Sequence, residues 1–149
     1  MASTVSSEQI SEFREKGVTV LRGVFSNWVD LLRKGVDANM ADPDPNARIY
    51  TGKDGGGRFF VDYCNWTRIT EYKEFIFKSN AATIGAELMD SKKVQLFHEH
   101  VLVKEAATGV PTPWHQDAPY YCVDSAKTVS LWIPLDDVPR ETTPEFICG

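Results

Sequence analysis

The chain has 149 residues, of which 42% are hydrophobic and 25% are charged, and its formal net charge is -5. A chain of this length buries about 70% of its unfolded surface, which is enough for one domain with its own core. The basic residues are scattered along the sequence. This argues against nucleic acid as the main partner, because phosphate binding needs Lys and Arg gathered on one face.

Two other classes of protein are disfavoured by simple patterns. The chain has no apolar run of about 18 residues, so it predicts no membrane span. Its amino terminus carries Glu8 and Glu12 and lacks an apolar centre, unlike a secretory signal. The three cysteines, Cys64, Cys122 and Cys148, show no CxxC spacing. They favour free thiols and a cytoplasmic location over a disulfide framework.

The first forty residues predict two helices and a short strand. Ser6 and Gln9 have the spacing of a capping box, which predicts a helix over residues 7–16 that ends at Gly17. The β-branched residues 18–21 indicate a strand. A second helix is expected to start from an N-cap at Ser26 and to carry an apolar stripe.

Residues 41–57 are rich in Asp, Pro and Gly and predict a long surface loop, either a lid over a site or a solvated connector. A strand is expected at 58–62. One or two helices follow between 66 and 89, with Ser79 as a candidate cap for the second.

The apolar periodicity changes towards two after residue 90, which is typical of strands. We expect strands at 94–103, 127–135 and 142–147, a loop at 105–113 and a turn at 136–139. Helices followed by strands indicate an α+β fold. The sequence therefore predicts a single domain over 1–149, with a helical part over about 1–90 and the strands over about 91–149.

The segment Pro113-Trp114-His115-Gln116-Asp117 carries the clearest chemistry. On an extended strand, His115 and Asp117 would leave from the same face, where an imidazole and a carboxylate can hold two adjacent positions of an octahedral metal. This is two-thirds of the facial triad of non-haem Fe(II) oxygenases. A His-x-Asp pair is common by chance, so its weight depends on the surrounding sequence.

That surrounding sequence resembles the phytanoyl-CoA dioxygenase family from about residue 8 to Gly149. The resemblance is carried, in chain order, by residues 13–26, 96–105, 114–121 and 128–136. It implies helices followed by a double-stranded β-helix, or jelly roll. It also implies Fe(II) and 2-oxoglutarate as cofactors, O2 as co-substrate and ascorbate as a supporting reductant. The implied reaction converts 2-oxoglutarate to succinate and CO2 and hydroxylates a small organic substrate.

The resemblance also implies roles for individual residues. His115 and Asp117 would be iron ligands, and a carboxylate at position 117 favours hydroxylation over halogenation. Trp132 and His100 match positions near 2-oxoglutarate, with core packing as their alternative role. Three further residues are candidates that each have a simpler alternative role. Gln116 would contact the cofactor, or would only form hydrogen bonds within a strand. Trp114 and Tyr120 would line the substrate pocket, or would only fill space.

The family pattern is only partly present. A third iron ligand, a distal His, and an Arg for the far carboxylate of 2-oxoglutarate belong downstream. All three histidines lie at or before position 115, and Arg140 is the only arginine after Asp117. We therefore expect a truncated chain that lacks a carboxy-terminal half. The family also prefers Pro-Gly where this chain has Ala106-Ala107, which bears on the local turn.

Two alternatives remain open from the sequence. His98, His100, His115 and Asp117 could meet around one divalent ion in a non-catalytic, cupin-like site. Alternatively, a second chain could supply the strands and ligands that the pattern lacks.

Overall fold

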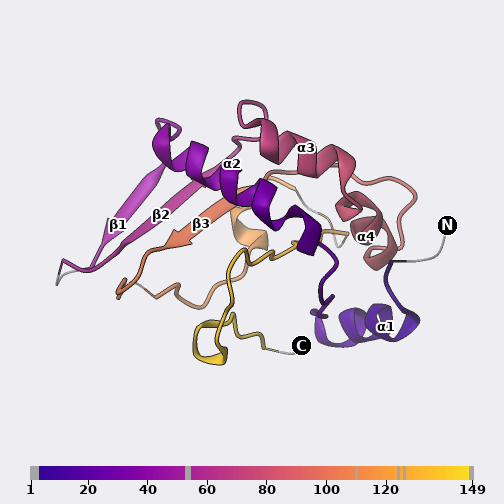
Figure 1. Ribbon diagram of the computed structural model, residues 1–149. Coiled ribbons are helices and arrows are strands. Elements are labelled where there is room, and N and C mark those ends of the chain that lie inside the picture. Colours follow the sequence, from indigo (N-terminus) through magenta and orange to yellow (C-terminus); the bar gives the residue numbers. More distant parts are fainter. Residues whose placement is uncertain (1–3, 53–54, 110, 124, 126, 148–149) are drawn as a thin grey trace. The chain divides into compact units, whose positions relative to one another are not determined.

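The computed structural model describes residues 4–52, 55–109, 111–123, 125 and 127–147. The helices are α1 (Ser7–Lys16), α2 (Val29–Ala41), α3 (Thr70–Lys78) and α4 (Ala81–Leu88) (Figure 1). The strands are β1 (Arg48–Thr51), β2 (Arg58–Tyr63) and β3 (His100–Lys104), and three single 3-10 turns are η1 (Ser26–Trp28), η2 (Ala118–Tyr120) and η3 (Arg140–Thr142). Helices together with one small antiparallel sheet give an α+β fold, as the sequence predicted.

The chain divides into two compact units. The helical unit comprises Met1–Arg33, Glu74–Leu96 and Lys127–Gly149, and the sheet unit comprises Lys34–Lys73 and Phe97–Ala126. Each unit is described by itself below.

The helical unit confirms the predicted capping box. The Ser6 hydroxyl accepts a hydrogen bond from the Gln9 N–H, the Gln9 side chain accepts from the Ser6 N–H, and Gly17 ends α1 at φ +76°. The Glu87 carboxylate of α4 accepts a 3.0 Å hydrogen bond from the N–H of Val5, whose side chain is 2% exposed. This bond fixes the chain entering α1 beside α4.

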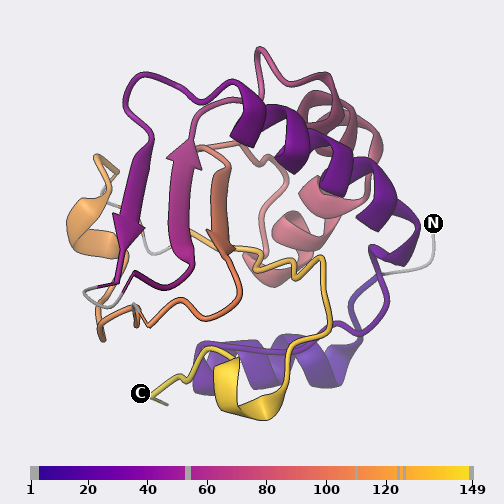
Figure 2. The same cartoon turned by 60° about the vertical axis from the view of Figure 1, so that its left-hand side comes forward.

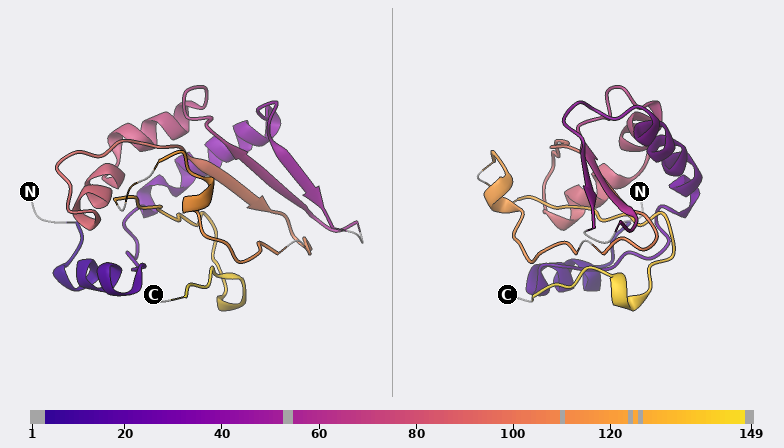
Figure 3. Two further views of the ribbon diagram at one scale, coloured as in Figure 1. Left: turned by 180° about the vertical axis from the view of Figure 1, so that it is seen from behind. Right: turned by 90° about the vertical axis from the view of Figure 1, so that its left-hand side faces the viewer.

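The sheet unit contains three antiparallel strands in the order β1-β2-β3 (Figure 2). Since side chains alternate along a strand, the sheet has two different faces. The inner face carries buried side chains such as Phe60, Asp62 and Val101. The outer face carries Tyr63 and Leu102, which are 40% and 49% exposed. The carboxy-terminal part of α2 and the turn η2 lie on opposite sides of this sheet (Figure 3).

A buried carboxylate joins the inner face to the elements around it. Asp62 is 1% exposed, and its Oδ2 accepts hydrogen bonds from Asn39 Nδ2 at 2.8 Å and from the Asp44 N–H at 3.0 Å. Its Oδ1 accepts from the Tyr63 N–H at 2.9 Å, and Arg68 Nη2 lies 3.9 Å from Oδ2. Burial acts to raise the pKa of Asp62, but the hydrogen bonds outweigh it and leave the pKa lowered.

The predicted loop at 41–57 is wrong in part, because residues 48–51 form β1. Ile49 pairs with Phe60 and Tyr50 with Phe59 in the register of β1 against β2. These β-branched and aromatic side chains suit a pleated surface. The connection to β2 needs glycine: a Cβ at Gly57 would lie 2.2 Å from the Ala106 carbonyl oxygen.

The remaining helices agree with the sequence prediction except at their first residues. Residues 26–28 form η1 and α2 begins at Val29, so Ser26 is not the N-cap of this helix. The helices expected between 66 and 89 are α3 and α4, and the strand expected at 58–62 is β2. The Ser79 hydroxyl accepts a 3.2 Å hydrogen bond from the Ala81 N–H, although Asn80 occupies the N-cap position of α4.

Most of the other predicted strands are wrong. Residues 18–21, 127–135 and 142–147 form no strand in the described structure, and the strand expected at 94–103 is reduced to β3. Strand propensity needs a neighbouring strand to become structure. Residues of these segments form other hydrogen bonds instead. The Val20 carbonyl accepts a hydrogen bond from Gln9 Nε2, and Lys127 Nζ donates one to the Asp90 carbonyl.

The turn after β3 holds a non-glycine residue in a left-handed conformation. The Thr108 N–H donates to the Glu105 carbonyl at 3.1 Å, and Ala107 lies at φ +62°. The Arg58 guanidinium and N–H both donate to the Glu105 carboxylate, and these bonds lower the pKa of Glu105 to about 2. The ion pair thus anchors a turn whose central residue is strained.

Replacing Ala107 by glycine should stabilise the protein. A left-handed non-glycine residue costs roughly 1–2 kcal/mol of stability, and glycine removes this strain. Part of the gain is lost, because glycine makes the unfolded chain more flexible, at a cost of roughly 0.4–1 kcal/mol. We expect the free energy of unfolding of Ala107→Gly, measured by urea denaturation, to rise by up to about 1 kcal/mol. Ala106→Gly is the matched control and should lower it, because Ala106 has no positive φ. An equal gain in both variants would contradict the strain.

Asn39→Leu tests the buried carboxylate. It keeps the branched shape of a side chain that is 0% exposed, but removes the donor to Asp62 and the acceptor of the Tyr72 hydroxyl. The free energy of unfolding should fall by about 2–3 kcal/mol at pH 7. Placing leucine at the exposed Asp37 of the same helix should change it by less than about 0.5 kcal/mol.

The loss of unfolding free energy in Asn39→Leu should depend on pH in a defined direction. The pKa of Asp62 in the folded protein is lowered below the usual value of an aspartate. Its stabilising contribution is therefore complete above that value and is lost as the pH falls through the lowered folded-state pKa. The difference between Asn39→Leu and the parent should shrink on titration from pH 7 into this acidic range. A constant difference would show that Asp62 is not the group involved.

Candidate functional site

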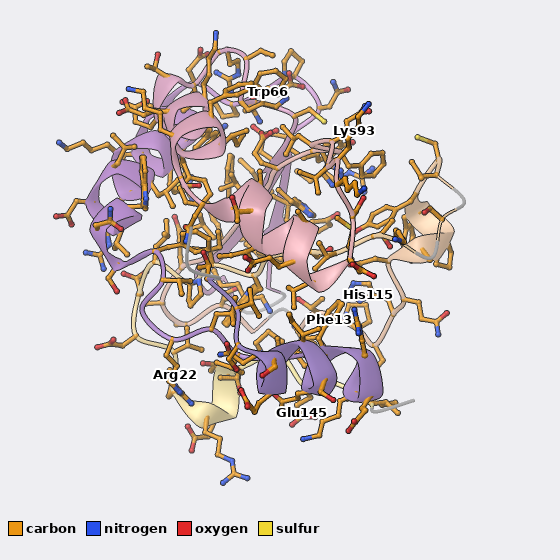
Figure 4. All side chains as sticks on the ribbon, turned by 90° about the vertical axis from the view of Figure 1, so that its right-hand side faces the viewer. Phe13, Arg22, Trp66, Lys93, His115 and Glu145 are labelled. Carbon is orange, nitrogen blue, oxygen red and sulfur yellow. The ribbon has the colours of Figure 1, made fainter. Side chains whose placement is uncertain are left out.

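The His-x-Asp pair lies in the sheet unit, on an irregular segment that leads into η2. Figure 4 labels His115 on this segment. Asp117 has φ -71° and ψ -37°, and its carbonyl accepts a 2.9 Å hydrogen bond from the Tyr120 N–H. The expectation that both residues lie on an extended strand is therefore wrong. Asp117, two residues after His115, is instead the N-cap of the single 3-10 turn η2.

The two side chains nevertheless meet. His115 Nε2 lies 3.3 Å from Asp117 Oδ1. The other ring nitrogen, Nδ1, lies 2.8 Å from the Pro113 carbonyl oxygen. Because a carbonyl can only accept, Nδ1 carries the proton. In the neutral ring, the lone pair is then on Nε2 and faces the carboxylate.

This arrangement fits a metal ion. Two lone pairs at 3.3 Å repel each other unless a proton or a cation lies between them. Ligands at about 2.1 Å in adjacent octahedral positions are about 3 Å apart, close to the observed separation. A backbone carbonyl that fixes the tautomer of a ligating histidine is also usual at metal sites. His115 and Asp117 are 42% and 51% exposed, so an ion can reach them.

A cluster of aromatic and imidazole rings lies on the outer face of the sheet. Tyr63 and His100 are opposite each other in the register, with ring centroids 5.9 Å apart. His98 lies 6.2 Å from His100 and 4.7 Å from Phe97. Tyr121, from the segment after η2, lies 5.0 Å from Phe97 and 6.0 Å from His98. We call these five residues the ring cluster.

The sequence interpretation missed three members of the ring cluster: Tyr63, Phe97 and Tyr121. Tyr63 could have been found only from the pairing of β2 with β3, which places it opposite His100. Tyr121 is only four residues after Asp117, and this proximity was the one signal available in the sequence.

Electrostatics favour a neutral His100. Desolvation lowers its pKa, and His98 adds to this effect because a second positive imidazole nearby is unfavourable. Asp117 and Asp62 act in the opposite direction without reversing it. A neutral imidazole offers one N–H donor and one acceptor, which suits contacts with a polar ligand.

The remaining predicted site residues lie in different settings. Tyr120 is 78% exposed, and its ring centroid is 6.4 Å from that of His115. Trp114 is 65% exposed, and Gln116 is also exposed. Trp132 is 53% exposed and belongs to the helical unit. Their roles towards cofactor and substrate remain predictions.

The alternative four-ligand site is not assembled. Within the described ranges, no three His, Cys, Asp or Glu side chains come together in a way that could hold a metal ion. His98 and His100 are engaged instead with the rings of the ring cluster. In this part of the chain, the proposed ligands His115 and Asp117 meet as a pair without a third such group.

Two further observations concern the setting of the protein. Cys64 and Cys122 are free and exposed, and Cys148 lies outside the described residues. Across the described residues, no helix combines the length and the apolar character needed to cross a membrane.

The structure thus combines an α+β fold with one imidazole and one carboxylate whose nearest atoms are 3.3 Å apart. The sequence matches the phytanoyl-CoA dioxygenase family (PhyH) over residues 13–147, which is most of the chain. The chain therefore belongs to this family, as the sequence resemblance indicated. Comparisons with curated proteins and with solved structures gave no match.

Proposed function

We propose that this protein is an Fe(II)- and 2-oxoglutarate-dependent oxygenase that hydroxylates a small organic substrate. The observation that carries the proposal is the pair His115 and Asp117, whose facing atoms are 3.3 Å apart, in a chain of the phytanoyl-CoA dioxygenase family. In this proposal they are two of three iron ligands. When bound, iron supplies the site at which O2 is used as 2-oxoglutarate becomes succinate and CO2.

The residues of the chain have distinct parts in this proposal. The Pro113 carbonyl holds His115 with its Nε2 lone pair towards the metal. His100, kept neutral, contacts 2-oxoglutarate together with Gln116. A third ligand and a basic partner for the far carboxylate are proposed to come from a second chain. The same source would complete the jelly roll of the family.

The setting is proposed to be the cytoplasm, because free exposed thiols suit a reducing compartment.

Metal binding tests the pair directly. Co(II), titrated into the metal-free chain and followed by visible absorption, should bind at one site. His115→Ala and Asp117→Ala should each weaken binding by at least about 10- to 100-fold, the loss that follows removal of even an outer-shell partner. His98→Ala is the matched imidazole control and should bind like the parent. Loss of binding in His98→Ala but not in His115→Ala would favour the alternative site instead.

Turnover tests the reaction class. With Fe(II), ascorbate and O2, succinate should form from 2-oxoglutarate and should fall to background in His115→Ala. His100→Ala should raise the KM for 2-oxoglutarate more than it lowers kcat, because this residue is proposed to contact the keto acid and not the metal. Equal succinate formation by the parent and His115→Ala would exclude the iron pair.

A further inference from the structure

Two positively charged side chains lie on the outer face of the sheet. Residues that are opposite each other in the register share a face, as do residues two apart in one strand. Arg48 of β1 is in the same row of the sheet as Leu102 of β3, which belongs to the outer face. Lys104 is two residues after Leu102 in β3. Both cations therefore project from the same side of the sheet as Tyr63 and His100.

Aromatic rings hold these two cations in place. The Lys104 ammonium lies 4.9 Å from the centroid of the Phe59 ring, and the Tyr50 ring lies 5.9 Å from the same ring. The phenol groups of Tyr50 and Tyr63 act on the Arg48 guanidinium and raise its pKa. Both cations thus border the ring pair of Tyr50 and Phe59. We call Arg48, Tyr50, Phe59 and Lys104 the basic face.

Other arginines of the sheet unit are engaged differently. Arg58 Nη2 lies 2.5 Å from the Glu105 carboxylate, and Arg68 Nη1 lies 3.3 Å from the Asp42 carboxylate. In the part of the chain that the structure describes, the cations of the basic face contact rings and phenols instead. A ring attracts a cation through its face and does not take up its N–H donors as a carboxylate does. The basic face therefore keeps donors for an anion.

The basic face is accessible and suits a planar ligand. Arg48 and Lys104 are exposed, and Tyr50 is 42% exposed. A guanidinium presents a planar fork of donors that matches a carboxylate. The Tyr50 ring beside it offers an apolar surface on which another ring can pack. A planar organic anion can therefore use the charge and the ring at the same time.

Tyr63 and His100 lie between the basic face and Asp117. Tyr63 acts electrostatically on Arg48, and its ring centroid is 5.9 Å from that of His100. Asp117 in turn acts electrostatically on His100. A molecule that is held at Arg48 can therefore extend along this side of the sheet towards the pair of His115 and Asp117.

We infer that the basic face binds a planar organic anion, with its carboxylate at Arg48 and Lys104 and its ring against Tyr50. That this anion is the substrate of the oxygenase rests on the proposed function; the binding itself does not. The substrate would then carry its negative charge away from the carbon that is hydroxylated. Binding energy from such a remote group can be used to orient the reacting carbon.

Benzoate and benzamide test the ligand class, because they have nearly the same shape and only benzoate is charged at pH 7. NMR titration of the metal-free, 15N-labelled chain should show saturable benzoate binding. The largest amide shifts should occur at Tyr50, at Phe59 and at residues 102–104. Benzamide should bind at least about tenfold more weakly, because it cannot form charge-assisted hydrogen bonds. Added salt should weaken benzoate binding, since the cations are exposed.

Substitutions at Arg48 test the assignment of the site. Arg48→Gln should weaken benzoate binding by about tenfold. Arg48→Glu should abolish it and should allow benzylammonium to bind instead. Lys34→Gln is the matched control, because it removes one positive charge from an exposed position on α2, and it should bind benzoate like the parent. Amide shifts outside β1 that match those of the parent will show that each variant keeps the fold.

Several outcomes would overturn the inference. They are the absence of saturable benzoate binding, equal affinities for benzoate and benzamide, and the parent affinity for benzoate in Arg48→Gln. An equal loss of affinity in Lys34→Gln and Arg48→Gln would also overturn it, because binding would then follow the net charge alone. Displacement of benzoate by an equal concentration of 2-oxoglutarate would assign the basic face to the co-substrate instead.

These outcomes are separate from those of the proposed function, because the titration uses no metal. Benzoate binding that depends on Arg48, in a protein that fails to bind Co(II), would leave the basic face established and the oxygenase rejected. Co(II) binding at His115 and Asp117 without benzoate binding would have the opposite meaning.

Discussion

The sheet unit depends on how one buried carboxylate is satisfied. Asp62 has almost no contact with solvent, and an unpaired charge in such a place would cost several kcal/mol. Its hydrogen-bond donors come from α2, from the segment that precedes β1, and from β2 itself. Meeting this one requirement therefore places a helix over the inner face of the sheet. The outer face, with Tyr63 and His100, is left for other contacts.

The pair of His115 and Asp117 is built differently, from backbone that belongs to no strand. Asp117 adopts a helical conformation and His115 is oriented by a carbonyl two residues earlier. The geometry that a regular strand was expected to supply is obtained here from a turn. A 3-10 turn can bring side chains two residues apart within 3.3 Å of each other. His115 and Asp117 thus come together although the described residues around them form no strand.

What could be predicted from the sequence is mostly local. The capping box at Ser6 predicts where α1 begins and the glycine at position 17 predicts where it ends, and the structure confirms both. The long-range features could not be predicted in the same way. β1 exists because it pairs with β2. Residues 48–51 do not indicate this pairing by themselves, and the residues around them are rich in Pro, Asp and Gly, which are typical of loops. Conversely, the strongest strand pattern, at 127–135, lies beside α4, where Val129 approaches Gly85.

The candidate site shows the same division. The His-x-Asp spacing and the family resemblance singled out His115 and Asp117 as candidate ligands, which stays a prediction. The family assignment is confirmed over residues 13–147. The ring cluster was not predicted as a unit, because its members come from β2, β3 and two loops. Their proximity follows from register, and a register cannot be read from one strand alone.

The contact between the Pro113 carbonyl and His115 has a consequence for how such a protein can evolve. Both partners of the imidazole, Pro113 on one side and Asp117 on the other, lie within one five-residue segment. The orientation of the His115 ring is therefore set by two contacts within this short segment. Substitutions on the sheet or on the helices can accumulate while this local arrangement is kept.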